Sequence, residues 1–508
     1  MSYLKSAYEL GLERIIASKY GDEIRAQEEA KHKQEVVRRS KLPGYVVDWE
    51  KTIAISEEDS VKEKEEEVDM GSVMVEDTQS KLYTKAEISQ KQNGNNNIDS
   101  NQDNIIPAYV HNPVKEFVPK PKVESMVDVK QDMKEVHWYG HFHSYTGFSR
   151  MNRAFAFGLS NKGVAVKADI EDGPIEINEA TQNQLNQLKA MKINPSAPKI
   201  FGATVPITMF HGGHKIAYTM METSKSLHKD YVEKLNLFDE VWVPTHQGKE
   251  LFRSNGVRPP IYVMPLGVDT QRYNPYQKSK SFCQTKGFTF LSVFKWGQRK
   301  GYDILLKSYL EEFSSADDTT LLLVSRVHSP HEKGRILEEV NYYLESSGIP
   351  QDELPHVALY DQEVLERDMP KLYRSCQAFV LISRGEGYAF PYYEAAACGL
   401  PIIGSYCSGQ KDLFDAADGA YLVEPEDYVK VGVNGPLAGL AKHCNFYDGQ
   451  YFPTFGEKTI EKVQSHMRDV YENYDEALEN ANELSQYVLN NCSWDHAIDK
   501  VYKRIEEL

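Results

Sequence analysis

The chain has 508 residues, which is enough for roughly two to four domains and excludes a peptide-like or disulfide-held fold. Lys and Arg number 58 against 75 Asp and Glu, so the formal net charge is −17. This acidic balance argues against non-specific binding of nucleic acid and against adhesion to anionic lipid. It still allows an anionic small molecule in a basic cleft, and we expect no nucleic-acid partner.

The six cysteines are widely spaced and include no C-x-x-C pair, which indicates reduced intracellular thiols rather than a disulfide framework or a zinc site. The first residues lack the basic start and apolar run of a signal peptide. The longest apolar runs, 321–324 and 378–382, are far too short to cross a bilayer. We therefore expect a cytoplasmic protein without a transmembrane segment.

Residues 1–133 differ in composition and hydrophobic pattern from the rest of the chain. The first 41 residues predict an exposed helix with little to bury, and a solvated face explains them better than a partner-binding surface. A Glu-dense run at 56–69, an Asn-rich run at 92–104 and scattered prolines follow. We interpret residues 1–133 as an N-terminal extension, made of a helix and a largely disordered tether.

From residue 134 onward, apolar runs alternate with helical patterns, as in a parallel α/β sheet. A first series, 134–280, contains predicted strands at 136–139, 207–210, 216–221, 240–243 and 261–264, with helices at 151–159, 229–235 and 248–254. A second series, 281–490, contains predicted strands at 288–294, 320–325, 356–360, 378–382, 401–405 and 421–423, with helices at 302–313, 333–346, 368–375, 392–398, 459–473 and 474–488. Two doubly wound, Rossmann-like domains facing a cleft are the predicted fold, and ligands of such folds bind at the carboxyl ends of the strands.

The most informative motif spans residues 383–403. A predicted buried strand ends at Ile382, a Gly-flanked turn carries Glu386, and a helix begins near Pro391 with Glu394 inside it. The free N–H groups at such a helix start bind anions, and two carboxylates beside them suit the hydroxyls of a sugar and a ribose. By themselves, the two glutamates are better explained as solvated charges at a helix start.

The surrounding residues favour the functional interpretation, because the stretch resembles the E-x7-E signature of retaining glycosyltransferase family 4. The matching residues are Glu386, Gly387, Tyr388, Ala389, Phe390, Pro391, Glu394, Ala395, Ala397, Gly399 and Pro401. Ala389 departs from the Gly that is common in the family. The resemblance implies that Glu394 binds the donor ribose, that Glu386 lies beside the transferred sugar, and that Tyr388, Ala389 and Phe390 belong to the donor site.

A second match follows the first strand of the second series, at 291–306. It is similar to the family's strand, basic residue, short loop, Lys-Gly and helix, with Lys295 in the place often held by Arg and Lys300 in the place of the family lysine. Both would neutralise the donor diphosphate. Arg299 is adjacent and is a further candidate, but the spacing favours Lys300. Asp303 is expected at the start of the helix.

A third match, at 238–275, is similar to the end of the family's first domain. Thr245 is the expected cap of the helix that follows, and Gly267 and Asp269 are expected to shape the turn between the domains. The resemblance as a whole runs from about residue 134 to the C-terminus and implies the GT-B architecture. It also implies that the last helix, within 491–508, returns to the first domain.

The first domain is less diagnostic. Gly147, in the loop after the first strand, fits a glycine that faces the donor phosphate or the acceptor. Residues 211–214 follow the predicted strand at 207–210, so we expect them at the carboxyl end of a strand, facing the cleft. Family members carry a first-domain histidine near the sugar, and either His211 or His214 would fill that place. Two loop histidines without a role explain the pair equally well. Glu222, after the next strand, is a candidate for binding the acceptor.

We expect no metal site. The histidines at 137, 141 and 143 have suggestive spacing, but a loop at a sheet edge explains them better. No D-x-D pair occurs in the first domain, so the transfer is expected to be independent of metal ions and of other cofactors.

The resemblance implies transfer of a glycosyl unit, with retention of configuration, from a nucleotide-diphosphate sugar to an unknown carbohydrate, lipid-linked or protein acceptor. The alternatives are a GT-B sugar epimerase, a phosphorylase, or a catalytically inactive module that binds sugar nucleotides. No pyridoxal lysine motif favours the phosphorylase, and the presence of Glu386, Glu394 and Lys300 weighs against an inactive module.

Overall fold

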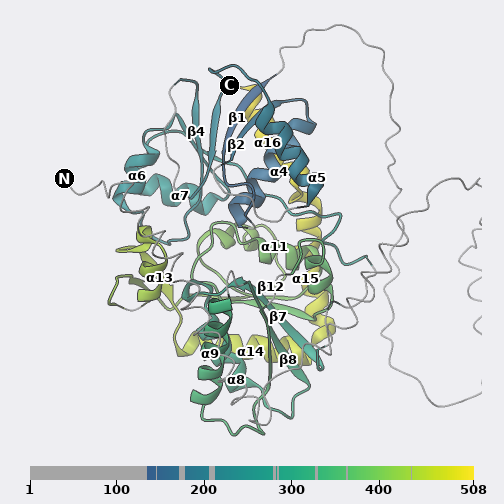
Figure 1. Cartoon of the computed structure of the whole chain (residues 1–508). Helices are drawn as coiled ribbons and strands as arrows, with labels where there is room; N and C mark the ends of the chain where they lie inside the picture. Colours follow the sequence, from purple (N-terminus) through teal and green to yellow (C-terminus); the bar gives the residue numbers. More distant parts are fainter. Residues whose placement is uncertain are drawn as a thin grey trace, which may run out of the picture. The chain divides into compact units, whose positions relative to one another are not determined.

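The described part of the chain contains two six-stranded parallel sheets, one from each series of strands (Figure 1). The structure is a computed structural model that describes residues 134–508 apart from 145, 171–177, 205–211, 278–281, 283–284, 327–329, 362–363 and 436. The predicted N-terminal helix and tether, and the predicted strand at 207–210, lie outside the described residues. The described residues fall within one compact unit.

The first sheet has the strand order β2-β1-β3-β4-β5-β6, and all its pairings are parallel. Its strands are β1 (Glu135–Gly140), β2 (Ala165–Ile170), β3 (Lys199–Gly202), β4 (Lys215–Tyr218), β5 (Glu240–Val243) and β6 (Ile261–Val263). Its helices are α4 (Gly147–Asn161), α5 (Glu179–Ala190), α6 (Lys229–Leu235) and α7 (His246–Ser254). Helix α4 begins after Thr146, whose hydroxyl accepts from the Ser149 N–H, and it buries Met151, Phe155 and Leu159 at four-residue spacing.

The second sheet has the order β12-β11-β10-β7-β8-β9 and is also wholly parallel. Its strands are β7 (Phe288–Lys295), β8 (Thr319–Arg326), β9 (His356–Tyr360), β10 (Ala378–Leu381), β11 (Ile402–Ser405) and β12 (Ala420–Val423). The helical segments are η1 (Gln298–Lys300), α8 (Tyr302–Glu312), α9 (Pro330–Ser346), α10 (Met369–Arg374), α11 (Phe390–Ala397), η2 (Ser408–Gln410), α12 (Lys411–Phe414), α14 (Glu457–Glu472) and α15 (Tyr474–Asn491). The chain moves outward from β7 through β8 to β9 and then returns to the other side of β7 as β10, which makes the β7–β10 boundary a topological switch point.

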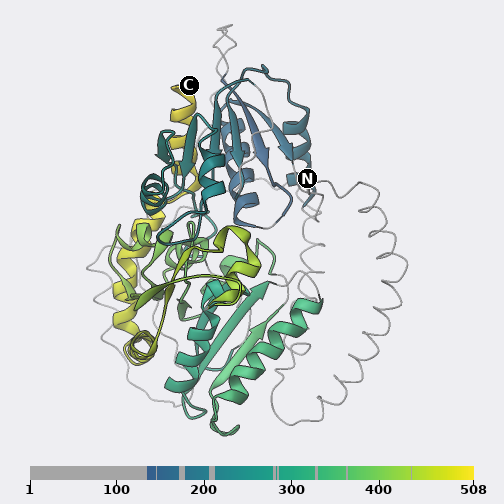
Figure 2. The same ribbon diagram turned by 90° about the vertical axis from the view of Figure 1, so that its left-hand side faces the viewer.

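The last helix, α16 (Trp494–Glu506), packs on the first domain (Figure 2). Its Arg504 guanidinium forms an ion pair with Glu240 at the start of β5. Gly267, in the connection between the domains, lies so close to the start of α16 that a Cβ there would come within 2.4 Å of the Trp494 Cα. The chain thus crosses between the domains at 264–268 and again before α16.

Residues 427–454 form a small separate layer, which we call the strap. It consists of the antiparallel strands β13 (Asp427–Lys430) and β14 (Tyr451–Thr454), with α13 (Ala438–His443) and η3 (Asn445–Tyr447) between them. The strap follows the second sheet in sequence, yet its apolar side chains join the core of the first domain, among them Leu440, Tyr447 and Phe452. Figure 1 shows α13 beside the first domain, below α6. No helix among the described residues is both long and apolar enough to span a bilayer.

Candidate active site

The candidate site lies at the switch point of the second sheet, where the loops after β7 and β10 meet. Gly301 has φ +68°, and a Cβ at this position would come within 1.8 Å of the Ile382 carbonyl, so the first loop is pressed onto the end of β10. Arg384 holds the same loop by two hydrogen bonds of 2.8 and 2.7 Å to the Asp303 carboxylate. The Arg384 N–H also donates to the Arg299 carbonyl at 2.7 Å. These contacts explain why side chains 86 positions apart in sequence reach one another.

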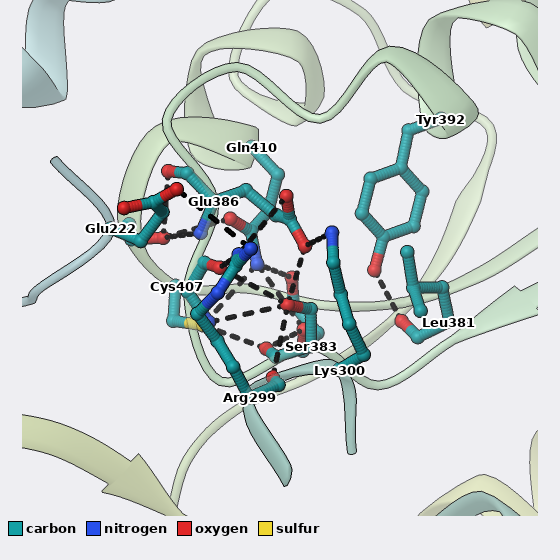
Figure 3. Close-up of polar contacts among 12 residues, drawn as sticks. Glu222, Arg299, Lys300, Leu381, Ser383, Glu386, Tyr392, Cys407 and Gln410 are labelled. Atoms are coloured by element: carbon teal, nitrogen blue, oxygen red, sulfur yellow. Dashed lines mark hydrogen bonds and ion pairs between the residues drawn. The ribbon is translucent and has the colours of Figure 1, made fainter. Parts of the chain in front are cut away.

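Four side chains of alternating charge form what we call the charge cluster (Figure 3): Glu222, Arg299, Lys300 and Glu386. The Lys300 Nζ lies 2.5 Å from one Glu386 oxygen, and an Arg299 nitrogen lies 3.4 Å from the other. A second Arg299 nitrogen lies 3.8 Å from Glu222, which comes from the first domain. The Ser383 hydroxyl donates to Glu386 at 2.6 Å. Cations and carboxylates balance in number, and all four side chains are at least four-fifths buried.

Burial and ion pairing act in opposite directions on the pKa values of this cluster. Burial would raise the pKa of Glu386, but Lys300 and Arg299 outweigh it and the net shift is downward. Burial lowers the pKa of Lys300, and the neighbouring Arg299 lowers it further, while Glu386 offsets only part of the fall. Both cations contact Glu386, and Arg299 also pairs with Glu222, so Lys300 is the less strongly compensated of the two. An added anion such as a diphosphate would stabilise the positive charge of Lys300.

Glu394 occupies a second polar centre, one turn into α11. It is 3% exposed and is bound by two partners from different domains. One oxygen pairs with the Arg150 guanidinium of α4, and the other accepts from the Tyr373 hydroxyl at 2.9 Å. Burial would lower the pKa of Arg150, but Glu394 and its other partners raise it, so the ion pair is retained.

The N-termini of α4 and α11 meet at this second centre. The Arg150 guanidinium carbon lies 4.7 Å from the Phe390 ring centroid, which is a cation–π distance. A Cβ on Gly147 would lie 3.6 Å from the same ring. The structure therefore brings Gly147 and Phe390 together, and with them the positive dipole ends of α4 and α11.

Tyr388 and Ala389 connect the two centres. The Tyr388 side chain is buried away from the charge cluster, because its hydroxyl donates to the Leu266 carbonyl at 2.6 Å and its ring stacks on Tyr393 with centroids 4.2 Å apart. Its side chain thus binds the connection between the domains. Ala389 has φ 71° and ψ 57°, the left-handed conformation that favours glycine, and it stands immediately before α11. The glycine common at this place is explained by this backbone conformation.

Lys295 and Arg299 differ in where the structure places them relative to the charge cluster. Lys295 is the exposed last residue of β7 and lies outside the charge cluster. Arg299 contacts both carboxylates of the cluster, and its guanidinium also donates to the Gly385 carbonyl. The side-chain alternation of β7 directs Lys295 to solvent, whereas the short turn of η1 brings Arg299 to the loop after β10.

Of the two candidate first-domain histidines, His214 does not reach this site. His211 lies outside the described residues. His214 immediately precedes β4, and its carbonyl accepts from the Lys199 N–H at the start of β3. Its ring pairs with Glu240, the first residue of β5, at 3.0 Å. His214 therefore belongs to the amino edge of a parallel sheet, opposite to the carboxyl edge that we expected, because the strand it adjoins begins after it rather than ending before it.

The His137, His141 and His143 set does not form a metal centre among the described residues, where no group of three His, Cys, Asp or Glu side chains is placed to hold an ion. His137 is instead paired with Asp169 at 3.0 Å. Two surface cavities of about 370 and 360 Å³ lie elsewhere, one lined by Asp418–Tyr421 with residues of α15, the other between α4 and α16.

Sequence reasoning missed three residues of the site. Arg150 and Tyr373 bind Glu394, and Tyr447 donates to Glu222 at 2.7 Å. Arg150 stands in the stretch that carries Gly147, so its charge at a helix start was a usable signal. Tyr447 lies 225 positions from Glu222 in the sequence, and no local sequence pattern in the strap indicates that the two residues are in contact.

Comparison with known proteins agrees with this geometry. The model of the family described as "Glycosyl transferases group 1" matches residues 285–432, which contain β7 to β13 and both loops of the charge cluster. Mannosylfructose-phosphate synthase of Agrobacterium fabrum is 24% identical over 179 residues, covering 34% of this chain and 38% of that protein. A GDP-mannose-dependent monoacylated α-(1-6)-phosphatidylinositol monomannoside mannosyltransferase of Corynebacterium glutamicum is 22% identical over 260 residues, covering 46% of this chain and 64% of that protein. The chain thus spans less than two thirds of either curated relative.

Solved structures extend the likeness of fold over both sheets. HepE of Anabaena, crystallised with UDP and glucose, superposes with a TM-score of 0.51 at 11% identity, covering 74% of this chain and 100% of that one. Sucrose-phosphate synthase of Thermosynechococcus elongatus gives 0.52 at 14% identity, covering 74% and 98%. Two Rossmann-like domains that meet at a basic switch point define the GT-B class of architecture. Residues 285–432 of the chain are thus similar to the group 1 glycosyltransferases, and its two sheets share the fold of these solved structures.

Proposed function

We propose that this protein transfers a glycosyl unit from a nucleotide-diphosphate sugar to an acceptor with retention of configuration. The charge cluster is the observation that carries the proposal. Arg299 and Lys300 are two buried cations at the carboxyl edge of a doubly wound sheet, with the start of α11 nearby. Such an arrangement suits a diphosphate leaving group, whose negative charge grows as the glycosidic bond breaks. The relatives' names are consistent with nucleotide-sugar donors, since one is GDP-mannose-dependent and another was crystallised with UDP and glucose.

In the proposed reaction, the bond between the anomeric carbon and the phosphate oxygen breaks while the acceptor hydroxyl attacks the same face of the sugar. The departing phosphate oxygen takes the proton of that hydroxyl, so no protein base is needed. Lys300 and Arg299 stabilise the leaving group, Glu386 lies beside the transferred sugar, and Glu394 binds the ribose. The Glu394 oxygens already bind Arg150 and Tyr373, but a carboxylate has about four acceptor positions, so two remain for ribose hydroxyls.

The first domain is in direct contact with the site, so a donor can enter only if the contacting segments move apart. A Cβ on Gly385 would come within 2.0 Å of the Glu222 carbonyl, and one on Gly387 within 2.5 Å of the Met220 side chain. The loop after β10 and the segment after β4 are therefore in contact. Binding of a donor between them requires these segments to separate, which is the domain opening that a cleft enzyme needs.

The proposal is tested by incubating the full chain with UDP-, GDP- and ADP-sugars and measuring release of the nucleotide diphosphate without acceptor. Slow release from one donor class is the expected result, and Lys300→Ala should abolish it. Binding without release in the wild type would favour the inactive sugar-nucleotide-binding alternative. Addition of EDTA should leave the rate unchanged, because the two cations of the cluster take the place of a divalent ion. Loss of release with EDTA and recovery with magnesium or manganese would contradict the proposed phosphate site.

We also propose that the protein works in a reducing compartment such as the cytoplasm. Among the described cysteines, Cys398, Cys407, Cys444 and Cys492 are free thiols, and Cys398 and Cys407 are buried. The acceptor can be identified by repeating the same release assay with panels of carbohydrate, lipid-linked and protein acceptors.

A further inference from the structure

The strap is attached to the segment of the first domain that follows β4. The Ser224 N–H donates to the Tyr451 carbonyl at 3.0 Å, and the Ser226 hydroxyl donates to the Gln450 side chain at 2.7 Å. Phe452 is fully buried in the first-domain core. The match to the family model ends at residue 432, so most of the strap lies outside it. The strap therefore holds residues 222–226 in place.

The strap reaches the charge cluster through one hydrogen bond. The Tyr447 hydroxyl donates to one oxygen of Glu222 at 2.7 Å. Burial and the Glu222 charge hold the pKa of Tyr447 well above its ordinary value, so the phenol keeps its proton and remains the donor. The other Glu222 oxygen faces Arg299 at 3.8 Å. Tyr447 thus fixes the direction in which Glu222 presents its second oxygen.

Glu222 and Glu386 lie on two sides of the same guanidinium (Figure 3). Arg299 is a proposed ligand of the diphosphate, and the transferred sugar is bonded directly to that diphosphate. A carboxylate beside Arg299 therefore lies within reach of the sugar hydroxyls. At 3.8 Å the contact of Glu222 with Arg299 is a loose ion pair, longer than a hydrogen bond, so its oxygen retains acceptor capacity.

We propose that Glu222 accepts a hydrogen bond from a hydroxyl of the transferred sugar and that Tyr447 of the strap positions it, so that this pair sets which donor sugar is preferred. The inference rests on the proposed function and adds a residue from the first domain to the sugar subsite. A site that hydrogen-bonds a hydroxyl discriminates strongly against a sugar that lacks the hydroxyl or presents it on the other face, because the buried carboxylate is then left without its partner.

The test compares binding of the nucleotide alone with binding of the nucleotide sugar. Affinities of the full chain for UDP, GDP, UDP-glucose, UDP-N-acetylglucosamine and GDP-mannose are measured by calorimetry for the wild type, Glu222→Gln and Tyr447→Phe. The control is Tyr309→Phe, which removes another buried hydroxyl, one that bonds within the second domain. The measured quantity is the ratio of the Kd for the free nucleotide to the Kd for its preferred sugar derivative.

In Glu222→Gln this ratio should fall about 10-fold or more, and in Tyr447→Phe about 3-fold, as expected for losing a charged hydrogen bond and for misdirecting it. Free nucleotide should bind Glu222→Gln as well as or better than the wild type, because a carboxylate that competes for Arg299 is gone. Tyr309→Phe should leave the ratio unchanged.

A folded Glu222→Gln protein with an unchanged ratio overturns the inference while leaving the proposed function intact. An equal loss of affinity for nucleotide and nucleotide sugar in Tyr447→Phe reduces the strap to a structural role and also overturns it. A wild type that binds no nucleotide sugar overturns the proposed function, and the inference with it.

Discussion

Glu386 and Glu394 stand eight positions apart in one motif, yet they occupy different environments. Glu386 is held mainly by its own domain, through Lys300, Arg299 and Ser383. Glu394 is held across the domains, with Arg150 on one oxygen. This difference shows that a single sequence motif contributes one carboxylate to each of two distinct polar sites. The direct partners of Glu386 all come from the second domain, whereas Glu394 gains its charged partner only when the first domain is in place.

The two centres differ in electrostatics as well. Glu386 contacts two cations, Lys300 and Arg299, which can also bind a further anion. Glu394 faces a single guanidinium and a neutral phenol, so its charge is matched one to one. This contrast suits a leaving-group site at Glu386 and a site for neutral hydroxyls at Glu394, and it yields the following predictions.

Lys300→Ala should have the largest effect. Removing a charge that is already in place where negative charge develops typically costs about 10²–10³ in turnover. Lys300→Arg should restore only part of it, because a planar fork does not reproduce a point charge. Lys295→Ala should cost less, and the exposed helix residue Lys307, changed to Ala, is the matched control. A near-normal kcat in a folded Lys300→Ala protein would show that the Glu386 centre takes no part in the reaction.

Alanine at each glutamate should separate the two centres kinetically. Glu394→Ala should weaken donor affinity about 10-fold or more with a smaller change in kcat, because a ribose contact is equal in ground and transition states. Glu386→Ala should lower kcat more than affinity, because its surroundings change as the bond breaks. Measuring the donor Kd and the single-turnover rate of each variant shows whether the change affects binding or turnover. The same pattern in both variants would show that the division is wrong.

A double-mutant cycle on Arg150 and Glu394 should measure the contact between the domains. We expect a coupling free energy of about 0.5–3 kcal/mol in urea unfolding, since the two side chains are buried and in direct contact. The pair Lys229 and Glu233, exposed on α6, is the control and should couple by about 0.5 kcal/mol or less. A coupling near zero for Arg150 and Glu394 would mean that the interdomain pair contributes nothing to the folded state.

The Glu386 centre should also give the protein a characteristic acid sensitivity. The pKa of Glu386 is lowered on folding from 4.5, so the stabilisation by its charge is present above that pH and is lost as the pH falls through the lower, folded value. Urea midpoints of the wild type and Glu386→Gln should therefore differ at pH 7 and converge below pH 4.5. Parallel curves over the whole range would mean that Glu386 carries no charge in the folded protein.

The smallest effect is expected at Ala389, between the two centres. Relief of its left-handed backbone in Ala389→Gly should outweigh the added freedom of the unfolded chain and raise stability by up to about 1 kcal/mol. Ala396→Gly, inside the same helix, should instead lose about 1 kcal/mol or more. Thermal melts of the two variants provide the comparison, and a lower melting temperature for Ala389→Gly would contradict it.

The sequence alone predicted most elements whose signal is local. The runs predicted at 229–235, 240–243 and 356–360 coincide with α6, β5 and β9, because a continuous apolar or 3.6-residue pattern determines such segments without outside help. The motif at 383–403 likewise predicted a turn followed by a helix, which the structure shows as α11. The ranges of β2, α5, β3 and the two strands of the strap were not predicted.

Only the tertiary structure decided which side chains meet. Arg299 rather than Lys295 contacts Glu386. Lys295 lies at the exposed end of a strand, whereas Arg299 lies in a turn that packs against β10. His214 stands at the far edge of its sheet, and Tyr447 reaches Glu222 from 225 positions away. The physical reason is common to all of them. Residue type and spacing are local properties of a chain, whereas the partner of a side chain depends on strand order, on which end of a strand it adjoins and on how two domains pack.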